Sequence, residues 1–513
     1  MSRTRNSIYN MFFGVLGKII TLIIQFIVRT VFIHYLGVEY LGIGGLFSNI
    51  LTCLSLAELG IGTAITFSLY EPINSNDTEK IAILMRIFKI SYIFIGSFVF
   101  VAGIFLTPFL SFFVKEMPDI PDISTIYILY VINTAISYFF SYKSTYIIAQ
   151  QKSYITTNNN NLIKIISSGV QIAILVLTQN YIFYLIIQLV GTFVTNLRIT
   201  LIANRIYPEL RIRTRAKLDS KTQSVIIQNI RAMIFHKIGT IVVFATDNIL
   251  LSKLFGVVIV GLYSNYSMVI AALESLIGLF FTSITASVGN LRVDSDIKHQ
   301  KDIYYILLFT NFAIYLVSTS VLSVAINPFV EVWAGFDYIM PLNCVIFIVV
   351  NFYLKGMRQI ATVFNASYGL VPYYKYLPIF ESAINILVSI IAGKVFGPVG
   401  IFVGTTVSTL TTCFWVEPFI LFKYGFKSEI NTYLRRYVLY TLITIASIGE
   451  SILLCFALSF TGIVRLIVSV VVSFSMSITL LIVFFHDTGE FKYMKNLVFK
   501  IFNELFFKKI KGI

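Results

Sequence analysis

Eight basic side chains lie inside long apolar stretches of the sequence, where each needs a counter-charge or a water-filled cavity. They are Lys18, Arg29, Lys143, Arg198, Arg231, Lys237, Lys355 and Arg358. A charge at the centre of a bilayer costs about 2.5–3.5 kcal/mol even on lenient insertion scales. Arg198 and Arg231 lie nearest the ends of their stretches and can extend to water, whereas the other six lie deeper.

Helical spacing gathers these cations into polar stripes, since residues seven or eleven positions apart share a helix face at about 100° per residue. Four stripes follow: Lys18, Gln25 and Arg29; Lys143, Tyr146 and Gln150; Lys237 and Asn248, with Asp247 beside them; and Asn351, Lys355, Arg358, Thr362 and Asn365. We predict a basic cavity for an anionic substrate, because arginine forks and ammonium groups suit phosphate oxygens. Its predicted binding residues are Lys18, Gln25, Arg29, Lys143, Lys237, Asn351, Lys355 and Arg358.

An alternative is that these cations pair with acidic residues in the same apolar stretches. Six acids are placed for this: Glu58, Asp247, Glu274, Glu381, Glu417 and Glu450. Each pair would neutralise one cation and remove it from substrate binding. The sequence leaves both interpretations open.

The stripes require membrane-spanning helices to position them. The chain is 57% hydrophobic and only 12% charged, against about 25% charged residues in soluble domains. Its apolar blocks of roughly 20–27 residues can cross a bilayer core of about 30 Å, and backbone groups in lipid must be paired internally. They lack the alternation of a transmembrane barrel. We predict an all-α polytopic membrane protein with fourteen spans: 9–35, 43–69, 90–114, 125–149, 162–178, 181–203, 225–254, 261–290, 303–327, 339–365, 373–396, 399–424, 437–459 and 463–485.

The distribution of basic residues predicts the orientation. If the amino terminus is cytoplasmic, the outside connections and helix ends hold only Lys115, Lys253, Lys394 and Arg465. By the positive-inside rule, both termini are then cytoplasmic. The tail 486–513 mixes apolar and basic residues, which is typical of an interfacial helix on an anionic leaflet and equally of a solvated basic tail.

Several other classes of protein are not favoured. The net charge of +15 lies mostly in short connections between apolar blocks, so it does not predict a nucleic-acid partner. The four cysteines and four histidines are scattered, which predicts no disulfide framework, metal site or other cofactor. No paired-carboxylate motif, phosphate loop or nucleophile constellation stands out. We therefore expect no enzyme; a membrane-embedded polysaccharide polymerase or glycosyltransferase is the weaker alternative.

An internal repeat divides the chain. Residues 17–42 match residues 236–261 without a gap at an offset of 219 (237−18, 256−37, 261−42), which pairs Lys18 with Lys237, Gly37 with Gly256 and Gly42 with Gly261. Repeats of this kind place a substrate site at their interface. We predict an amino-terminal lobe of six helices (1–203), a basic cytoplasmic linker (204–224), a carboxyl-terminal lobe of six helices (225–425), two further helices (426–485) and a basic tail (486–513).

The stretches SRTRNSIYNMFFG (2–14), FIVRTVFIHYLGVEYLGIGGLFSNIL (26–51) and SLAELGIGTAITFSLYEPI (55–73) resemble Wzx-type polysaccharide flippases. These belong to the multidrug/oligosaccharidyl-lipid/polysaccharide exporter superfamily. The resemblance implies alternating-access transport of undecaprenyl-pyrophosphate-linked oligosaccharide across the bacterial cytoplasmic membrane, for capsule, exopolysaccharide or O-antigen synthesis. It implies cavity-lining roles for Lys18, Arg29, Lys237, Lys355 and Arg358, and polysaccharide polymerase and chain-length machinery as partners.

The resemblance also implies coupling to an ion gradient or to the membrane potential. Glu58 and Asp247 are candidates for binding H⁺ or Na⁺, although Glu58 lies in LAELGIG, where a helix-packing role is at least as natural. Two related functions remain open. A lipid II flippase handles the same lipid pyrophosphate, and a multidrug exporter would favour an acidic cavity for its cationic substrates.

Overall fold

A computed structural model describes residues 3–58, 60–212, 214, 216, 218–220, 223–224, 226–227, 245–457 and 460–496. These residues form helices, short 3₁₀ and π turns and connections, with no strand among them. The chain divides into two compact units, Met1–Ser264 (unit 1) and Asn265–Ile513 (unit 2), and the boundary lies inside helix α9 (Val257–Asp294). The predicted domain boundaries, with a linker at 204–224, stay a prediction.

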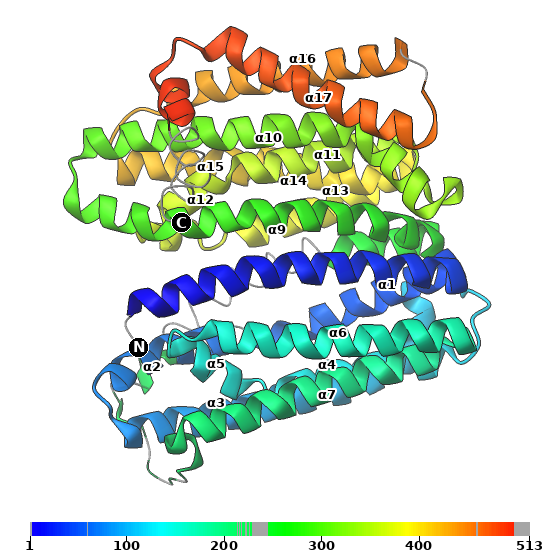
Figure 1. Ribbon diagram of the computed structural model, residues 1–513, viewed down its shortest axis with the longest axis vertical. Helices are drawn as coiled ribbons and strands as arrows, with labels where there is room; N and C mark the ends of the chain where they lie inside the picture. Colours follow the sequence, from blue (N-terminus) through cyan, green and yellow to red (C-terminus); the bar gives the residue numbers. More distant parts are fainter. Residues whose placement is uncertain are drawn as a thin grey trace, which may run out of the picture. The chain divides into compact units, whose positions relative to one another are not determined.

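The described part of unit 1 contains seven complete helices before residue 207 (Figure 1). They are α1 (Arg3–Leu54), α2 (Ile61–Asn74), α3 (Thr78–Leu106), α4 (Ile123–Phe139), α5 (Tyr142–Ala149), α6 (Ser153–Thr178) and α7 (Tyr181–Ile206). Side-chain caps fix two of the starts: Asp77 accepts a hydrogen bond from the Lys80 amide before α3, and Asn180 accepts from the amides of Ile182 and Phe183 at α7. Each cap satisfies amide groups that a helix start otherwise leaves unpaired.

Unit 2 continues from α9 with eight helices among its described residues. They are α10 (Ile297–Ala334), α11 (Leu342–Met357), α12 (Gln359–Ser367), α13 (Leu377–Phe396), α14 (Val399–Thr411), α15 (Cys413–Ile420), α16 (Asn431–Ala457) and α17 (Gly462–Phe485). Two of the predicted spans are broken helices here. The first is interrupted at Arg358, between α11 and α12, and the second at Thr412, between α14 and α15.

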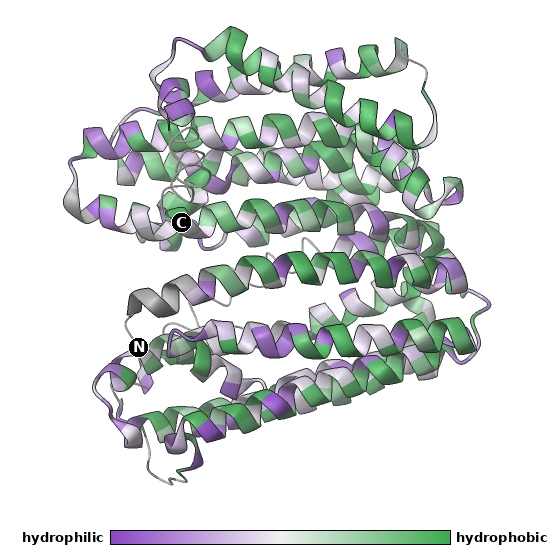
Figure 2. Cartoon of the chain, in the orientation of Figure 1, coloured by the Kyte–Doolittle hydropathy of each residue, from purple (hydrophilic) through white to green (hydrophobic). Residues whose placement is uncertain are grey.

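The faces of the helices are those of a polytopic membrane protein. Figure 2 shows apolar residues along the helices of both units, with polar residues at helix ends and connections and also along parts of α6 and α7. Large apolar side chains remain exposed, among them Leu177 (80%), Leu453 (72%) and Phe94 (70%). A soluble monomer does not expose apolar surface on this scale, whereas lipid requires it. Aromatic side chains fill the interior of each unit, as where Phe312 stacks on Tyr440 at 4.1 Å.

The described residues contain eleven helices long and apolar enough to span a membrane, or twelve if α4 and α5, bent by 44°, form one span. One of the eleven, Phe12–Leu54, runs through Gly37 (φ 82, ψ −173), where two helices join. The predicted span 225–254 lies mostly outside the described residues. The count of fourteen stays a prediction.

The glycines of the predicted repeat share unusual geometry within unit 1. Gly37 and Gly256 both have positive φ, 82° and 93°, which is accessible to glycine at little cost. Gly42 and Gly261 lie against each other, because a Cβ on Gly42 would overlap the Val257 carbonyl, and one on Gly261 would overlap that of Val38. The first part of α9 therefore packs on α1 backbone to backbone.

Candidate functional site

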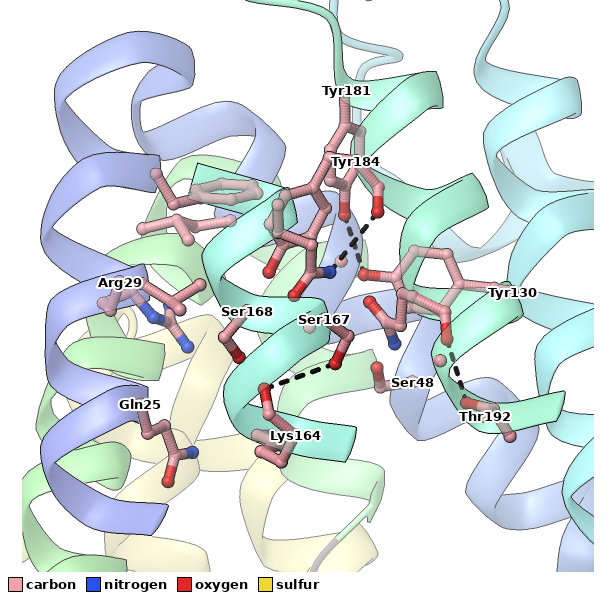
Figure 3. A pocket seen from close by; sticks show the side chains of 18 of the residues that line it. Gln25, Arg29, Ser48, Tyr130, Lys164, Ser167, Ser168, Tyr181, Tyr184 and Thr192 are labelled. Carbon is pink, nitrogen blue, oxygen red and sulfur yellow. Dashed lines mark hydrogen bonds between the residues drawn. The ribbon is translucent and has the colours of Figure 1, made fainter. Parts of the chain in front are cut away.

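A polar cavity of about 560 Å³ lies inside unit 1. Its walls come from α1, α4, α6, α7 and the start of α9 (Figure 3). The lining residues are Gln25, Val28, Arg29, Phe32, Tyr40, Leu41, Gly44, Gly45, Ser48, Tyr130, Ser137, Asn160, Lys164, Ser167, Ser168, Gln171, Tyr181, Tyr184, Gln188, Gly191, Thr192, Thr195, Asn196 and Ser264. The volume falls within the range of about 300–1,000 Å³ that is usual for small-molecule sites.

Helical periodicity explains why three helices each present a polar face here. On α7 the lining positions begin at Tyr181 and Tyr184 and continue through Gln188, Thr192 and Thr195 at steps of three or four residues. Such steps keep side chains on one helix face. The stripes on α6 (160, 164, 167, 168, 171) and on α1 (25, 28, 29, 32) follow the same spacing.

Close helix packing holds α6 and α7 together at the cavity wall. A Cβ on Gly191 would lie 3.0 Å from the Ser167 Cβ, so glycine permits the approach. The Gln171 Nε2 donates a hydrogen bond to the Tyr184 carbonyl oxygen at 3.3 Å, which ties the two helices across the cavity.

Two cations line the cavity. The Arg29 Nη1 donates to the Ser264 hydroxyl at 3.0 Å, and the guanidinium lies close to Tyr130, Tyr181 and Tyr184. Lys164 on α6 is the second cation. None of the 24 described lining residues is acidic, so the cavity has a net positive charge that suits an anion.

Of the residues predicted to bind substrate, Gln25 and Arg29 line this cavity, and their side chains point into it in Figure 3. Lys18 lies half-buried two turns earlier on α1, beyond the lining set. Lys164 is not among the predicted binding residues, although it lies within the predicted span 162–178. The signal that could have found it is the polar spacing of α6, where Asn160, Lys164, Ser168 and Gln171 share a face.

Lys143 lies outside the cavity, in another part of unit 1. Its Nζ donates to the Asn204 Oδ1 at 2.7 Å and lies 5.8 Å from the centre of the Tyr142 ring. Lys143 therefore links α5 to α7. Lys237 lies outside the described residues, so its predicted role stays a prediction.

Arg358 in unit 2 forms a buried ion-pair cluster rather than lining an open cavity. Its Nε and Nη2 donate to the two carboxylate oxygens of Glu417 at 3.1 and 2.8 Å, and its Nη1 donates to Glu381 at 3.3 Å. The Thr409 hydroxyl and the Cys413 thiol each donate to Glu381 at 3.0 Å. The surroundings of Arg358 are therefore those of the alternative interpretation of the sequence, in which a cation in an apolar stretch pairs with acidic residues.

Two other predicted residues of unit 2 also have partners. The Lys355 Nζ lies 2.8 Å from a carboxylate oxygen of Glu274. Asn351 donates to the Phe402 carbonyl at 3.0 Å and accepts from the Thr406 hydroxyl at 2.7 Å, so it joins α11 to α14. A role of Lys355 and Asn351 in substrate binding stays a prediction. A bound substrate would have to replace the contacts that these side chains make here.

The two candidates for ion coupling both lie in unit 1. Glu58 accepts a hydrogen bond from the Tyr92 hydroxyl at 2.9 Å, and a Cβ on Gly62 would overlap that hydroxyl. The packing role among small residues is therefore visible in the structure. Asp247 is buried, with 7% of its surface exposed. No group of three or more His, Cys, Asp or Glu side chains arranged to hold a metal ion occurs among the described residues.

Three solved structures show which proteins share this fold. The lipid II flippase MurJ, in an inward closed conformation, aligns with a TM-score of 0.66 and 14% identity, over 93% of this chain and 99% of its own. An inward-facing multidrug resistance MATE family transporter of the MOP superfamily aligns with a TM-score of 0.62 and 14% identity, over 76% and 91%. A MATE transporter of Vibrio cholerae aligns with a TM-score of 0.57 and 13% identity, over 82% and 99%.

No protein-family profile and no curated protein sequence matches the chain. The structural likenesses establish the fold, that of a multi-pass helical membrane protein built like these transporters and flippases. At 13–14% identity they carry no assignment of substrate.

Proposed function

We propose that this chain is a flippase that moves undecaprenyl-pyrophosphate-linked oligosaccharide from the inner to the outer leaflet of the bacterial cytoplasmic membrane. The observation that carries the proposal is the cavity of unit 1, which Arg29 and Lys164 line and which has no acidic lining residue among those described. A pyrophosphate is a multiply charged anion, and cationic hydrogen-bond donors recognise such groups best.

The fold supports the same proposal. The lipid II flippase MurJ aligns over 93% of this chain. A flippase must carry a polar headgroup past the hydrocarbon core while the lipid tail stays in the bilayer, and a polar cavity bounded by apolar outer faces provides such a route. We propose alternating access as the mechanism, with both termini cytoplasmic and with Glu58 and Asp247 as candidates for binding a coupling H⁺ or Na⁺.

A lipid II flippase is the second candidate, favoured by the MurJ likeness, and both headgroups would engage Arg29 through pyrophosphate. A multidrug exporter is less compatible, because its cationic substrates would face Arg29 and Lys164 without an acidic lining residue among those described.

The test is lipid translocation in proteoliposomes. Wild type is compared with Arg29→Ala, Lys164→Ala and the control Lys394→Ala, which removes an exposed cation in the last turn of α13. We expect wild type and the control to move undecaprenyl-pyrophosphate oligosaccharide and the two cavity variants to lose at least about tenfold in rate, as the loss of one charge-assisted contact predicts. Expulsion of cationic dyes by a wild type that moves no lipid would replace the proposal with the drug-exporter function.

A further inference from the structure

The cavity of unit 1 contains far more neutral polar groups than a pyrophosphate needs. Sixteen of its 24 lining residues carry a neutral hydroxyl or amide side chain, and two carry a positive charge. Hydroxyl and amide groups both donate and accept hydrogen bonds, whereas a phosphate requires donors only. The composition therefore suits a ligand rich in hydroxyl groups that is attached to an anion.

We propose that Tyr130, Tyr181 and Tyr184, the tyrosine cluster, form with Gln171 and Gln188 a saccharide subsite that recognises the glycan of the substrate. The inference rests on the proposed function and deepens it. It assigns the glycan to the tyrosine cluster and the pyrophosphate to the two cations.

Aromatic contacts hold the two rings of the tyrosine cluster that lie on α7. The Tyr181 and Tyr184 rings are stacked, with centroids 5.9 Å apart and planes at 27°. Phe32 contacts each of them edge-on at 5.4 Å. Such contacts stabilise aromatic pairs beyond the burial of their area, so the wall is preorganised before a ligand binds. Tyr181 is buried and supports the other two rings, which are partly exposed. A partly exposed tyrosine ring with a polar tip offers an apolar face and a hydrogen-bonding group to a sugar ring.

A glycine makes room for the hydroxyl groups of this wall. The Tyr130 and Tyr181 hydroxyls share a hydrogen bond of 2.7 Å, visible in Figure 3. A Cβ on Gly44 would lie 2.7 Å from the first hydroxyl and 3.0 Å from the second. Any larger residue at position 44 would push the pair apart. The backbone of α1 is thus shaped around these two hydroxyls.

The cavity is long enough for a glycan and a pyrophosphate together. Its lining residues on α7 run from Tyr181 to Asn196, which at 1.5 Å per residue is about 22 Å. In the tyrosine cluster, Tyr181 and Tyr184 lie at the start of α7 and Tyr130 lies on α4. Arg29 lies near these rings, and Lys164 lies farther along the cavity. A sugar on the rings would place its linked phosphates between the two cations.

The experiment measures binding of two lipids to the full-length protein in nanodiscs. One is lipid-linked oligosaccharide extracted from the membranes of the producing cells, and the other is undecaprenyl pyrophosphate without a glycan. The variants are Tyr184→Ala, which removes the ring, Tyr184→Phe, which removes only its hydroxyl, and Arg29→Ala. Tyr373→Ala is the matched control, since this tyrosine is 59% exposed in unit 2.

We expect Tyr184→Ala to weaken binding of the glycan-bearing lipid about tenfold and to leave the bare lipid within about twofold. Tyr184→Phe should retain most of the affinity, and Arg29→Ala should weaken both lipids. Equal weakening of both lipids by Tyr184→Ala, or no weakening of either, would overturn the subsite. If Tyr184→Ala does not fold, Gln188→Ala takes its place with the same expected difference between the lipids.

Failure of the proposed function gives a different result. If wild type binds neither lipid, the free oligosaccharide released from the extracted lipid is used as the probe. Binding of that oligosaccharide by wild type, with loss in Tyr184→Ala, would support the saccharide subsite without the flippase. Absence of binding by wild type would overturn the subsite as well.

Discussion

Replacing Arg358 by Met should destabilise unit 2 rather than act only on substrate binding. The guanidinium is 20% exposed and donates three hydrogen bonds to Glu417 and Glu381, whose side chains are 6% and 10% exposed. Removing it leaves two buried carboxylates without their counter-charge. Breaking a buried pair in this way costs about 3–5 kcal/mol.

Thermal unfolding in detergent measures this loss. For a folding unit of this size, each kcal/mol lowers the midpoint by about 2–4 °C, so we expect a decrease of about 6–20 °C. The double variant Arg358→Met/Glu417→Met removes the bidentate pair together. The remaining Glu381 keeps its hydrogen bonds from Thr409 and Cys413, and the double variant should therefore lose less stability than the sum of the single variants.

The double-mutant cycle also separates structure from substrate binding. A coupling energy above about 1 kcal/mol exceeds the 0.3–0.5 kcal/mol scatter of independent sites. If Arg358 is structural, the double variant should recover transport together with stability. An unchanged midpoint in Arg358→Met, or strict additivity of the two substitutions, would refute the reasoning. If the double variant recovers stability but not transport, Arg358 acts in substrate binding as the sequence predicts.

Three further predictions concern close contacts and charge. Gly44→Ala should break the hydrogen bond between the Tyr130 and Tyr181 hydroxyls. In the nanodisc binding assay the affinity for glycan-bearing lipid should then fall about fivefold, which corresponds to the loss of one hydrogen bond of about 1 kcal/mol. Gly261→Leu should lower the thermal midpoint, because the new side chain would overlap the backbone of Val38. Overpacking of this kind costs about 1–3 kcal/mol or more. The control Gly278→Leu, with open space around position 278, should leave the midpoint unchanged. Burial raises the pKa of Glu490, but the hydrogen bond and charge of Arg436 outweigh it and lower that pKa overall. The Arg436–Glu490 pair should therefore stabilise the fold at pH values above the unfolded pKa of about 4.3, and this stabilisation should be lost as the pH falls below that value. Glu490→Gln should flatten the curve of thermal midpoint against pH in this acidic range. An unchanged slope in the variant would contradict the pairing.

The candidate site was predictable only in part. The spacing of Gln25 and Arg29 along α1 indicated one polar face, and both residues line the cavity. The same reasoning treats Lys355 and Arg358 as equivalent to them, although Lys355 pairs with Glu274 and Arg358 with Glu417 and Glu381. Spacing reports which face of a helix a residue occupies, but it does not report which helix that face meets. An acid on another helix therefore decides whether a cation is available to a ligand.

The sequence by itself determined that the chain is helical and spans a membrane, because long apolar blocks in lipid must pair their own backbone groups. It also paired Gly37 with Gly256 through the internal repeat, and both glycines have positive φ in the structure. Only the tertiary structure decided that the polar faces of α6 and α7 line the same cavity as Arg29, and that the tyrosine cluster lies beside this arginine. Contacts between residues more than a hundred positions apart depend on helix packing, which the periodicity of a single helix does not encode.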